Sequence, residues 1–284
     1  MLISNFGSDY EILKTSNGQK LERWGNITLL RPDPIIIWNN EKINQSEADA
    51  IYHRSNTGGG YWENLKKVPE TWKIHYNKLT FNIKQMGFKH TGLFPEQAVN
   101  WERMIETIQK SQNSNIKVLN LFAYTGGATV ACLSAGASVV HVDSSKGMNA
   151  WAKENVISSG LENRPVRFLV DDVIKFVQRE IRRGNKYDAI VMDPPSYGKG
   201  ANKEIWNIEK DLDYLLTLCK QILNDSFLFV CVNTYSTNIS VLTLENLLKT
   251  HFNCKKIQVD EIGLPIKNTN LILPCGITGW ITNN

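Results

Sequence analysis

KVLNLFAYTGG, residues 117 to 127, decides the fold class of this chain. The run KVLNLFA is mostly apolar and typical of a buried strand, and Tyr124-Thr125-Gly126-Gly127 forms a turn into a helix that begins near Ala128. A glycine pair at such a turn lets the backbone come close to a ligand, and the helix that follows aims its amide groups at that ligand. The stretch therefore predicts a strand, a ligand-binding turn and a helix.

The same alternation of apolar strand and helix continues to the end of the chain. The later apolar runs are SVVHVD, VRFLVDD, DAIVMD, FLFVCVN, CKKIQVDEI and an extended segment near residues 271–281. Near-continuous apolar strands separated by helices predict an α/β fold, in which helices cover both faces of a parallel sheet that starts near residue 116. A sheet of this kind binds its ligand at the carboxyl ends of the strands.

The N-terminal part of the chain has a different texture. Short extended runs (YEILK, KLERW, ITLLR and IIIW) alternate with turn sequences, which predicts a small β-rich domain. A polar segment over 39–60 ends in NTGGG, as in a flexible linker. We therefore expect a β-rich domain with its linker over 1–60 and a larger domain over 61–284, which opens with a β-hairpin at 72–92 and a helix that starts at Pro95.

Composition is that of a folded protein in a reducing compartment. The 284 residues are 42% hydrophobic and 21% charged, and the net charge of +4 is compatible with a polyanionic partner without requiring one. The basic run REIRRGNK, residues 179–186, favours a solvated helix face over a nucleic-acid contact. Five dispersed cysteines are typical of buried thiols. Because metal-ligand spacing, a signal peptide and a membrane-length apolar run are all missing, we expect a cytoplasmic protein without metal or membrane.

Acidic residues end the strands that follow the glycine turn. Asp143 ends the second strand, where a carboxylate accepts both hydroxyls of a ribose, Asp171 and Asp172 end the third, and Asp193 ends the fourth. The glycine run reads GGATV and lacks the third glycine of the pyrophosphate fingerprint. A cofactor with ribose and adenine but no phosphate fits this set, and S-adenosylmethionine is the common one.

The fourth strand runs into VMDPPSYGKG, residues 191–200. Its two prolines fix φ and remove backbone donors, so the carbonyls of Asp193 and Pro194 are expected to point outward as acceptors. Tyr197 is either a stacking platform for a base or a plain turn aromatic. An ordinary strand-ending turn is the alternative for the whole motif, because Pro, Ser and Gly are common in turns.

Together, TGLFPEQAVNW, NLFAYTGGATVA, VDSSKGMNAWAKEN, VDDVIKF and DPPSYGKG resemble the class I S-adenosylmethionine-dependent methyltransferases. Within that class they are most similar to the bacterial ribosomal RNA large-subunit methyltransferases with an Asp-Pro-Pro motif. The resemblance implies a Rossmann-like sheet and a methyl-transfer site. Its implied catalytic residues are Asp193, Pro194 and Tyr197, and its implied cofactor-binding residues are Phe122, Tyr124, Thr125, Gly126, Asp143, Ser144, Asp172, Val173 and Asp193.

Three departures from the family pattern limit what the resemblance implies. Relatives that methylate a pyrimidine carbon use a cysteine after the fifth strand, where this chain reads VNTYS, and Cys231 lies earlier, inside the strand. Relatives also read Asp-Gln-Arg where this chain has Glu96-Gln97-Ala98, which leaves the role of Gln97 open. The β-rich start matches the RNA-binding domain of relatives poorly.

The sequence therefore predicts an S-adenosylmethionine-dependent methyltransferase that acts on RNA, at a nitrogen of a ribosomal RNA base rather than at a pyrimidine carbon. Two alternatives stay open: a methyltransferase for a protein or small molecule, and a non-catalytic RNA-binding module with the same fold. The target atom and the oligomeric state do not follow from the sequence.

Overall fold

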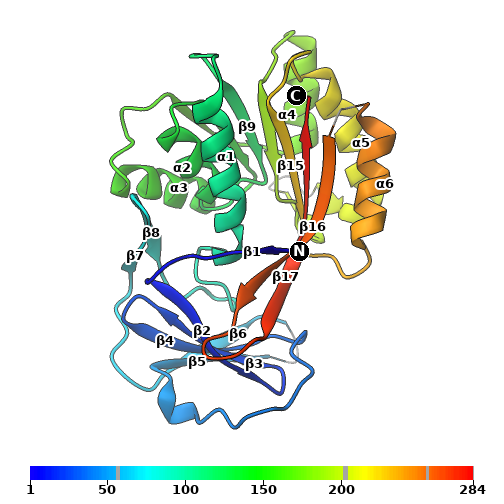
Figure 1. Cartoon of the computed structure of the whole chain (residues 1–284). Coiled ribbons are helices and arrows are strands. Elements are labelled where there is room, and N and C mark those ends of the chain that lie inside the picture. The colour runs from blue at the N-terminus through cyan, green and yellow to red at the C-terminus, as the bar shows by residue number, and fades with distance from the viewer. Residues whose placement is uncertain (56–57, 201–203, 254–255, 284) are drawn as a thin grey trace. The chain divides into compact units, whose positions relative to one another are not determined.

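A computed structural model describes residues 1–55, 58–200, 204–253 and 256–283 of the chain (Figure 1). Its residues form two compact units. The first comprises Met1, Asn100–Ile262 and the residues from Gly276 onward, and the second comprises Leu2–Val99 and Gly263–Cys275. These units divide the chain near residue 100, whereas the domain division at residue 60 stays a prediction. Asn56 and Thr57 of the expected linker, and Cys254, lie outside the described residues.

The largest sheet has eight strands in the order β1-β16-β17-β15-β12-β9-β10-β11. Its centre is parallel, as predicted, and β17 pairs antiparallel with β15, which was not predicted. The connection from β16 to β17, residues 266–271, is shorter than the crossover that parallel neighbours need, so β17 turns back against β16 and lies antiparallel between β16 and β15. The strands are β1 (Leu2–Ile3), β9 (Lys117–Leu121), β10 (Ser138–Asp143), β11 (Val166–Val170), β12 (Ala189–Met192), β15 (Phe229–Thr234), β16 (Lys256–Pro265) and β17 (Ile272–Thr282).

Helices cover both faces of this sheet, which confirms the predicted Rossmann-like class (Figure 1). On one face lie α1 (Ala98–Lys110), α2 (Gly127–Ser134) and α3 (Lys146–Ser158), and on the other lie α4 (Val173–Arg182), α5 (Ile208–Gln221) and α6 (Val241–His251). Because β9 is flanked by β10 on one side and β12 on the other, the strand order reverses beside β9. The ends of β9, β10 and β12 thus form the position where such sheets bind ligands.

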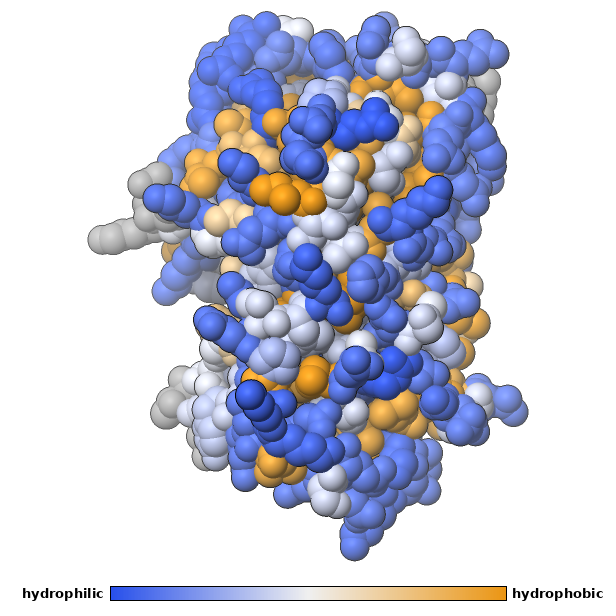
Figure 2. Space-filling view, turned by 90° about the vertical axis from the view of Figure 1, so that its left-hand side faces the viewer, coloured by the Kyte–Doolittle hydropathy of each residue, from blue (hydrophilic) through white to orange (hydrophobic). Residues whose placement is uncertain are grey.

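Burial explains why these segments became strands and helices of this sheet. Every residue of β12 and β15 is buried, as expected for strands covered on both faces. In α4, Val173, Phe176 and Val177 follow helical spacing and pack into the core. On the face that Figure 2 shows, hydrophilic residues cover most of the surface and hydrophobic ones form small groups between them.

The second unit is rich in β-structure, as predicted. It contains a five-stranded sheet in the order β2-β3-β4-β5-β6 and a separate hairpin, β7-β8. The hairpin ends at Ile83, earlier than the expected residue 92. The elements are β2 (Tyr10–Ser16), β3 (Gln19–Trp24), β4 (Ile27–Pro32), η1 (Gln45–Glu47), β5 (Ala50–Arg54), β6 (Gly60–Asn64), β7 (Trp72–Tyr76), β8 (Leu79–Ile83) and η2 (Pro95–Gln97), the last leading into α1 as expected from Pro95.

Two expectations for this unit are wrong. The segment expected as a polar linker contains β5, because Ala50 and Ile51 are buried in the sheet. The run IIIW does not form a strand: Ile36 is buried, whereas the neighbouring Ile37 is 89% exposed. The run instead contributes carbonyls to the turn between β2 and β3, where the amide of Gly18 donates to the carbonyl of Ile36 at 2.7 Å.

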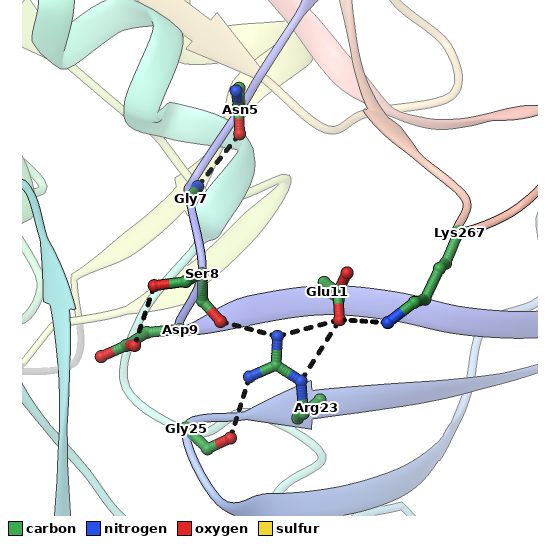
Figure 3. A network of polar contacts seen from close by, with 8 residues as sticks. All are labelled: Asn5, Gly7, Ser8, Asp9, Glu11, Arg23, Gly25 and Lys267. Carbon is green, nitrogen blue, oxygen red and sulfur yellow. Dashed lines mark hydrogen bonds and ion pairs between the residues drawn. The ribbon is translucent and has the colours of Figure 1, made fainter.

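Residues far apart in the chain complete the second unit. The amide of Lys267 donates to the carbonyl of Ile12 at 2.9 Å, and the Lys267 ammonium donates to Glu11 at 3.0 Å. Arg23 on the neighbouring strand donates to the same Glu11 carboxylate and to the carbonyls of Ser8 and Gly25 (Figure 3). The segment Gly263–Cys275 is therefore fixed to β2 by backbone and charged hydrogen bonds.

Candidate functional site

The ends of three neighbouring strands coincide in register. Leu121, the last residue of β9, lies beside Val142 of β10 and Met192 of β12. The next residue along each strand is therefore Phe122, Asp143 or Asp193. The tertiary structure brings these three predicted site residues to one edge of the sheet.

The turn after β9 has an unusual backbone. Phe122 and Tyr124 have φ values of 52° and 49°, and Gly126 has a φ of 83°. A non-glycine residue with positive φ stores strain, and such residues cluster at functional sites. The predicted cofactor turn thus holds two such residues, Phe122 and Tyr124, and a positive-φ glycine within five positions.

The two glycines of the turn approach protein rather than open space. A Cβ on Gly126 would lie 3.0 Å from the Cβ of Ala152 on α3, and one on Gly127 would lie 2.6 Å from the ring of Trp101 on α1. The sequence-based explanation, that they let the backbone approach a ligand, is therefore incomplete. At these positions glycine lets the turn pack against two helices.

Asp143 is half-buried, and among the described residues its carboxylate accepts hydrogen bonds from two backbone amides. The amide of Tyr124 donates to its Oδ2 at 2.9 Å, and the amide of Ser145 donates to its Oδ1 at 2.8 Å. Burial raises the pKa of Asp143, and these two hydrogen bonds lower it only in part. Each oxygen keeps a lone pair for a further donor, so this carboxylate can accept hydrogen bonds from two hydroxyl groups. Ser144 lies beside it, half-buried.

A buried polar layer beneath the turn was missed in the sequence. The side-chain amide of Asn120 donates to the hydroxyl of Thr129 at 2.9 Å, and that hydroxyl hydrogen-bonds Nδ1 of His141 at 2.9 Å. Asn155 on α3 donates to the carbonyl of Thr125 at 2.8 Å, and burial lowers the pKa of His141 to about 3. A signal existed, because Asn120 and His141 are single polar residues inside apolar strands. The layer fixes the turn from below.

Asp171 and Asp172, which follow β11, are both engaged within the protein. Asp172 is the N-cap of α4 and accepts from the amide of Lys175 at 2.9 Å, and the adjacent Val173 is buried. Asp171 forms an ion pair with Arg179. Asp172 thus has the capping role that any aspartate can have, and its side chain is half-buried.

The Asp-Pro-Pro segment leads into a small hairpin made of β13 (Tyr197–Lys199) and β14 (Ile205–Asn207). Pro194 is buried, whereas Tyr197 is 54% exposed. The carbonyl of Pro195 accepts from the indole nitrogen of Trp206 at 2.7 Å. The outward carbonyls expected at Asp193 and Pro194 stay a prediction, whereas the carbonyl of Pro195 is engaged within the protein.

Trp206 is a further residue that the sequence did not single out. Its ring packs on Phe122 with the centroids 4.7 Å apart, so one side chain contacts both the turn after β9 and the Asp-Pro-Pro segment. At the other end of β14, Glu204 forms an ion pair with Lys175 at 2.6 Å. The hairpin therefore contacts Phe122, which follows β9, and the first turn of α4.

The fifth parallel strand carries no reactive thiol. Cys231 is fully buried in β15, and burial raises its pKa to about 12. Its neighbour Asn233 accepts from the side chain of Asn100 at 3.0 Å, and Asn100 accepts from Thr278 at 3.2 Å. These are the contacts of a structural strand end, in agreement with the prediction that Cys231 is a buried thiol.

The described part of the chain shows neither a metal-binding group nor a membrane-spanning helix. None of its His, Cys, Asp and Glu residues gather in a group that could hold a metal ion. None of its helices combines the length and apolar character needed to cross a membrane.

Residues 44–251 match the family model of S-adenosylmethionine-dependent methyltransferases. The chain belongs to this family. A solved structure, the SAM-dependent methyltransferase from Agrobacterium tumefaciens, is 32% identical, with a TM-score of 0.94 over 100% of this chain and 93% of that one. The resemblance seen in the sequence, the enzyme class and its S-adenosylmethionine cofactor are thereby confirmed.

Two proteins similar to this methyltransferase are named as ribosomal RNA methyltransferases. Ribosomal RNA large subunit methyltransferase K of Neisseria meningitidis is 27% identical over 74% of this chain and 57% of its own length. Ribosomal RNA large subunit methyltransferase K/L of Shewanella baltica is 28% identical over 66% of this chain and 25% of its own length. The chain thus spans between a quarter and just over half of the length of these relatives.

Proposed function

We propose that the chain transfers a methyl group from S-adenosylmethionine to a base of ribosomal RNA, with a ring or exocyclic nitrogen as the acceptor. The observation that carries this proposal is the coincidence of the Tyr124 turn, Asp143 and Asp193 at the ends of three adjacent strands. When bound, the cofactor supplies an electrophilic methyl group on a sulfonium. The residues of the chain have to bind it and to position the acceptor.

The hydrogen-bonding groups present fit this cofactor. Asp143 has acceptor capacity left for two ribose hydroxyls, since each oxygen accepts one amide and no basic side chain adds to its stabilisation. In the proposal Phe122, Ser144, Asp172 and Val173 border the nucleoside, and Tyr124, Thr125 and Gly126 border the methionine part. The strained turn supports this role, because a backbone held by the packing around it needs no ordering when a ligand binds.

In the proposal Asp193 and Pro194 are the hydrogen-bond acceptors that position the substrate nitrogen. A carboxylate and a carbonyl fixed by two prolines accept hydrogen bonds from an amine or ring nitrogen and direct its lone pair toward the methyl group. Tyr197, at 54% exposure, is available to stack on a base. A target base inside a duplex has to be flipped out to reach this segment.

The choice of nitrogen over pyrimidine carbon rests on Cys231. Its thiol is buried and its pKa is raised to about 12, so almost none of it is thiolate at neutral pH. A ribosomal RNA substrate is supported by the names of the two relatives, and it would place the protein in the cytoplasm. The alternatives, a protein or small-molecule substrate, lack a comparable observation.

The test is single-turnover transfer of a labelled methyl group to total RNA from a strain that lacks the protein, measured beside cofactor binding by calorimetry. Asp193→Ala is expected to lower transfer a hundredfold or more, the order typical of losing one preorganised contact. It should leave S-adenosylmethionine affinity within about tenfold, or about 1.4 kcal/mol. Pro194→Ala should show a milder form of the same pattern. Transfer at the parental rate by Asp193→Ala would contradict the assignment.

A further inference from the structure

Arg54 and Lys89 of the second unit are cations without an acidic partner among the described residues. Arg54, the last residue of β5, is exposed, and Lys89 is half-buried in the loop after β8. Neither side chain forms an ion pair or hydrogen bond with another described residue, unlike Lys14, Lys66 and Lys267 of the same unit. Lys73 and Lys78 are also unpaired among the described residues, but Arg54 and Lys89 differ from them in that each lies within range of the other's charge. Phe88 directly precedes Lys89 in the loop, and its large hydrophobic side chain is 61% exposed.

Strand pairing and loop contacts bring these residues together. Arg54 lies beside Gly60 where β5 pairs with β6. A Cβ placed on the adjoining Gly59 would lie 3.9 Å from the carbonyl oxygen of Gly87, the residue before Phe88. The indole nitrogen of Trp62 on β6 donates to the carbonyl of Met86 at 2.8 Å. The loop that carries Phe88 and Lys89 therefore lies against the end of β5 and β6.

The loop is held in place from both sides. The amide of Lys84 donates to the carbonyl of Thr91 at 3.2 Å and closes the loop. Arg31 donates to the carbonyl of Lys89 at 2.8 Å, and its guanidinium is itself fixed by two hydrogen bonds to Glu22. A ligand that binds here meets a preformed backbone.

Positive charge exceeds negative charge around Lys89. Burial lowers the pKa of its ammonium, and Lys20, Arg31 and Arg54 lower it further, against the opposite effect of Asp33. The nearby acids are engaged: Glu22 pairs with Arg31 and Lys20, and Asp33 pairs with Lys20. The pKa of Glu96 is raised by burial to about 7, which reduces its negative charge, and His90, with a pKa lowered by burial to about 4, is neutral.

The basic run at 179–186 differs in this respect. Arg179 pairs with Asp171, Arg183 pairs with Glu180, and Lys186 donates to the carbonyl of Gln221. Three of its four cations are thus engaged within the protein, and the fourth, Arg182, is exposed, which agrees with the interpretation of a solvated helix face. Around Lys89 an anion is the missing partner.

We propose that Arg54 and Lys89 bind the phosphate groups of a single-stranded RNA segment and that Phe88 stacks on one of its bases. Cations beside an exposed aromatic ring are the combination by which proteins bind single strands. The inference rests on the proposed RNA substrate and adds a binding surface on the second unit, formed by Arg54, Phe88 and Lys89.

The test uses the full chain and a fluorescein-labelled single-stranded RNA of about 12 nucleotides, within the range of single-strand binding sites. Binding is followed by anisotropy over a series of salt concentrations. The double variant Arg54→Gln/Lys89→Gln should bind about tenfold more weakly. Its plot of log affinity against log salt should be shallower by about 1.4, the slope for two phosphate contacts on a single strand.

The matched control is Lys73→Gln/Lys78→Gln, which removes the same charge from exposed positions of the same unit. It should change affinity less than twofold. Phe88→Ala should weaken binding about tenfold with no change in salt slope, and Phe88→Trp should restore it. A double variant that matches its control, or a parental chain that does not bind this RNA, would overturn the inference.

Methyl transfer distinguishes this inference from the proposed function. Where RNA is the substrate, the Arg54→Gln/Lys89→Gln variant should raise the KM for RNA about tenfold and keep the parental kcat. A parental chain that shows the Arg54 and Lys89 dependence of binding but methylates no RNA would disprove the proposed function and leave the binding surface established.

Discussion

Glu22 and Asp143 are carboxylates held in opposite ways, one in each unit. Glu22 has no exposed side-chain surface and accepts hydrogen bonds from Arg31 and Tyr10, with Lys20 3.5 Å away. Burial alone would raise its pKa, but Arg31 and Lys20 outweigh burial and lower it to about 2. Asp143 accepts two backbone amides, and its pKa is raised because no cation offsets its burial.

The difference separates a structural carboxylate from one available to a ligand. The acceptor sites of Glu22 are occupied by charged partners, so removing its charge should cost stability and leave ligand binding unchanged. Asp143 has spare acceptor capacity and a poorly stabilised charge, which hydroxyl donors of a ligand would improve. Four variants break or sharpen this comparison.

The largest effect is expected for Glu22→Gln. It leaves Arg31 buried without its counter-charge, and breaking a buried pair typically costs about 3–5 kcal/mol of the free energy of unfolding. Urea denaturation measures it. Glu47→Gln, which breaks the half-exposed pair with Lys14, is the control and should cost less than about 1 kcal/mol. Equal losses in the two variants would show that the buried pair of Glu22 and Arg31 contributes no more to stability than a half-exposed pair does.

Glu96 tests a carboxylate whose burial outweighs the effect of the nearby cations Lys20 and Arg31. Its pKa is about 7 in the folded chain against an ordinary value of 4.5, so its contribution to stability is complete below pH 4.5 and is lost as the pH rises through 7. The shift corresponds to about 3 kcal/mol. Glu96→Gln should therefore be more stable than the parent at pH 9 by about that amount, with the gain vanishing at pH 4. Urea midpoints that differ equally at both pH values would refute the assignment.

Asp143→Ala should weaken S-adenosylmethionine binding by about 1.5–3 kcal/mol, the usual loss for hydrogen bonds to a charged group. Burial disfavours the charge of Asp143, so its removal should lower the free energy of unfolding much less than Glu22→Gln does. Calorimetry with the cofactor and urea denaturation give the two numbers. Unchanged cofactor affinity would place the ribose elsewhere.

The smallest effect is expected for Trp206→Phe. It keeps a ring against Phe122 and loses the hydrogen bond to the carbonyl of Pro195, worth about 1 kcal/mol. Methyl transfer should fall severalfold if that bond positions the Asp-Pro-Pro segment. Trp72→Phe, which loses a similar bond to the carbonyl of Trp24 in the second unit, is the control and should transfer at the parental rate. Equal rates in both variants would make Trp206 purely structural.

Local sequence was sufficient to predict the elements that are marked by an apolar run or by a proline at a helix start. Apolar runs such as KVLNLFA and FLFVCVN and the helix signal at Pro95 predicted the parallel sheet and α1, because burial on both faces and proline geometry act over a few residues. The same patterns failed at IIIW and at β5. Whether a short apolar run becomes a strand depends on a partner strand that is distant in the chain.

For the candidate site, the sequence by itself determined the residue types at the strand ends, namely the Gly126 turn, Asp143, Asp172 and the Asp-Pro-Pro segment. Only the tertiary structure decided which of them coincide, since the register at Leu121 aligns Asp143 with Asp193 and an ion pair with Arg179 engages Asp171. It also decided the charge environment of each carboxylate. The physical reason is that strand ends follow from local patterns, whereas register, burial and ion pairing are set by contacts between residues far apart in the chain.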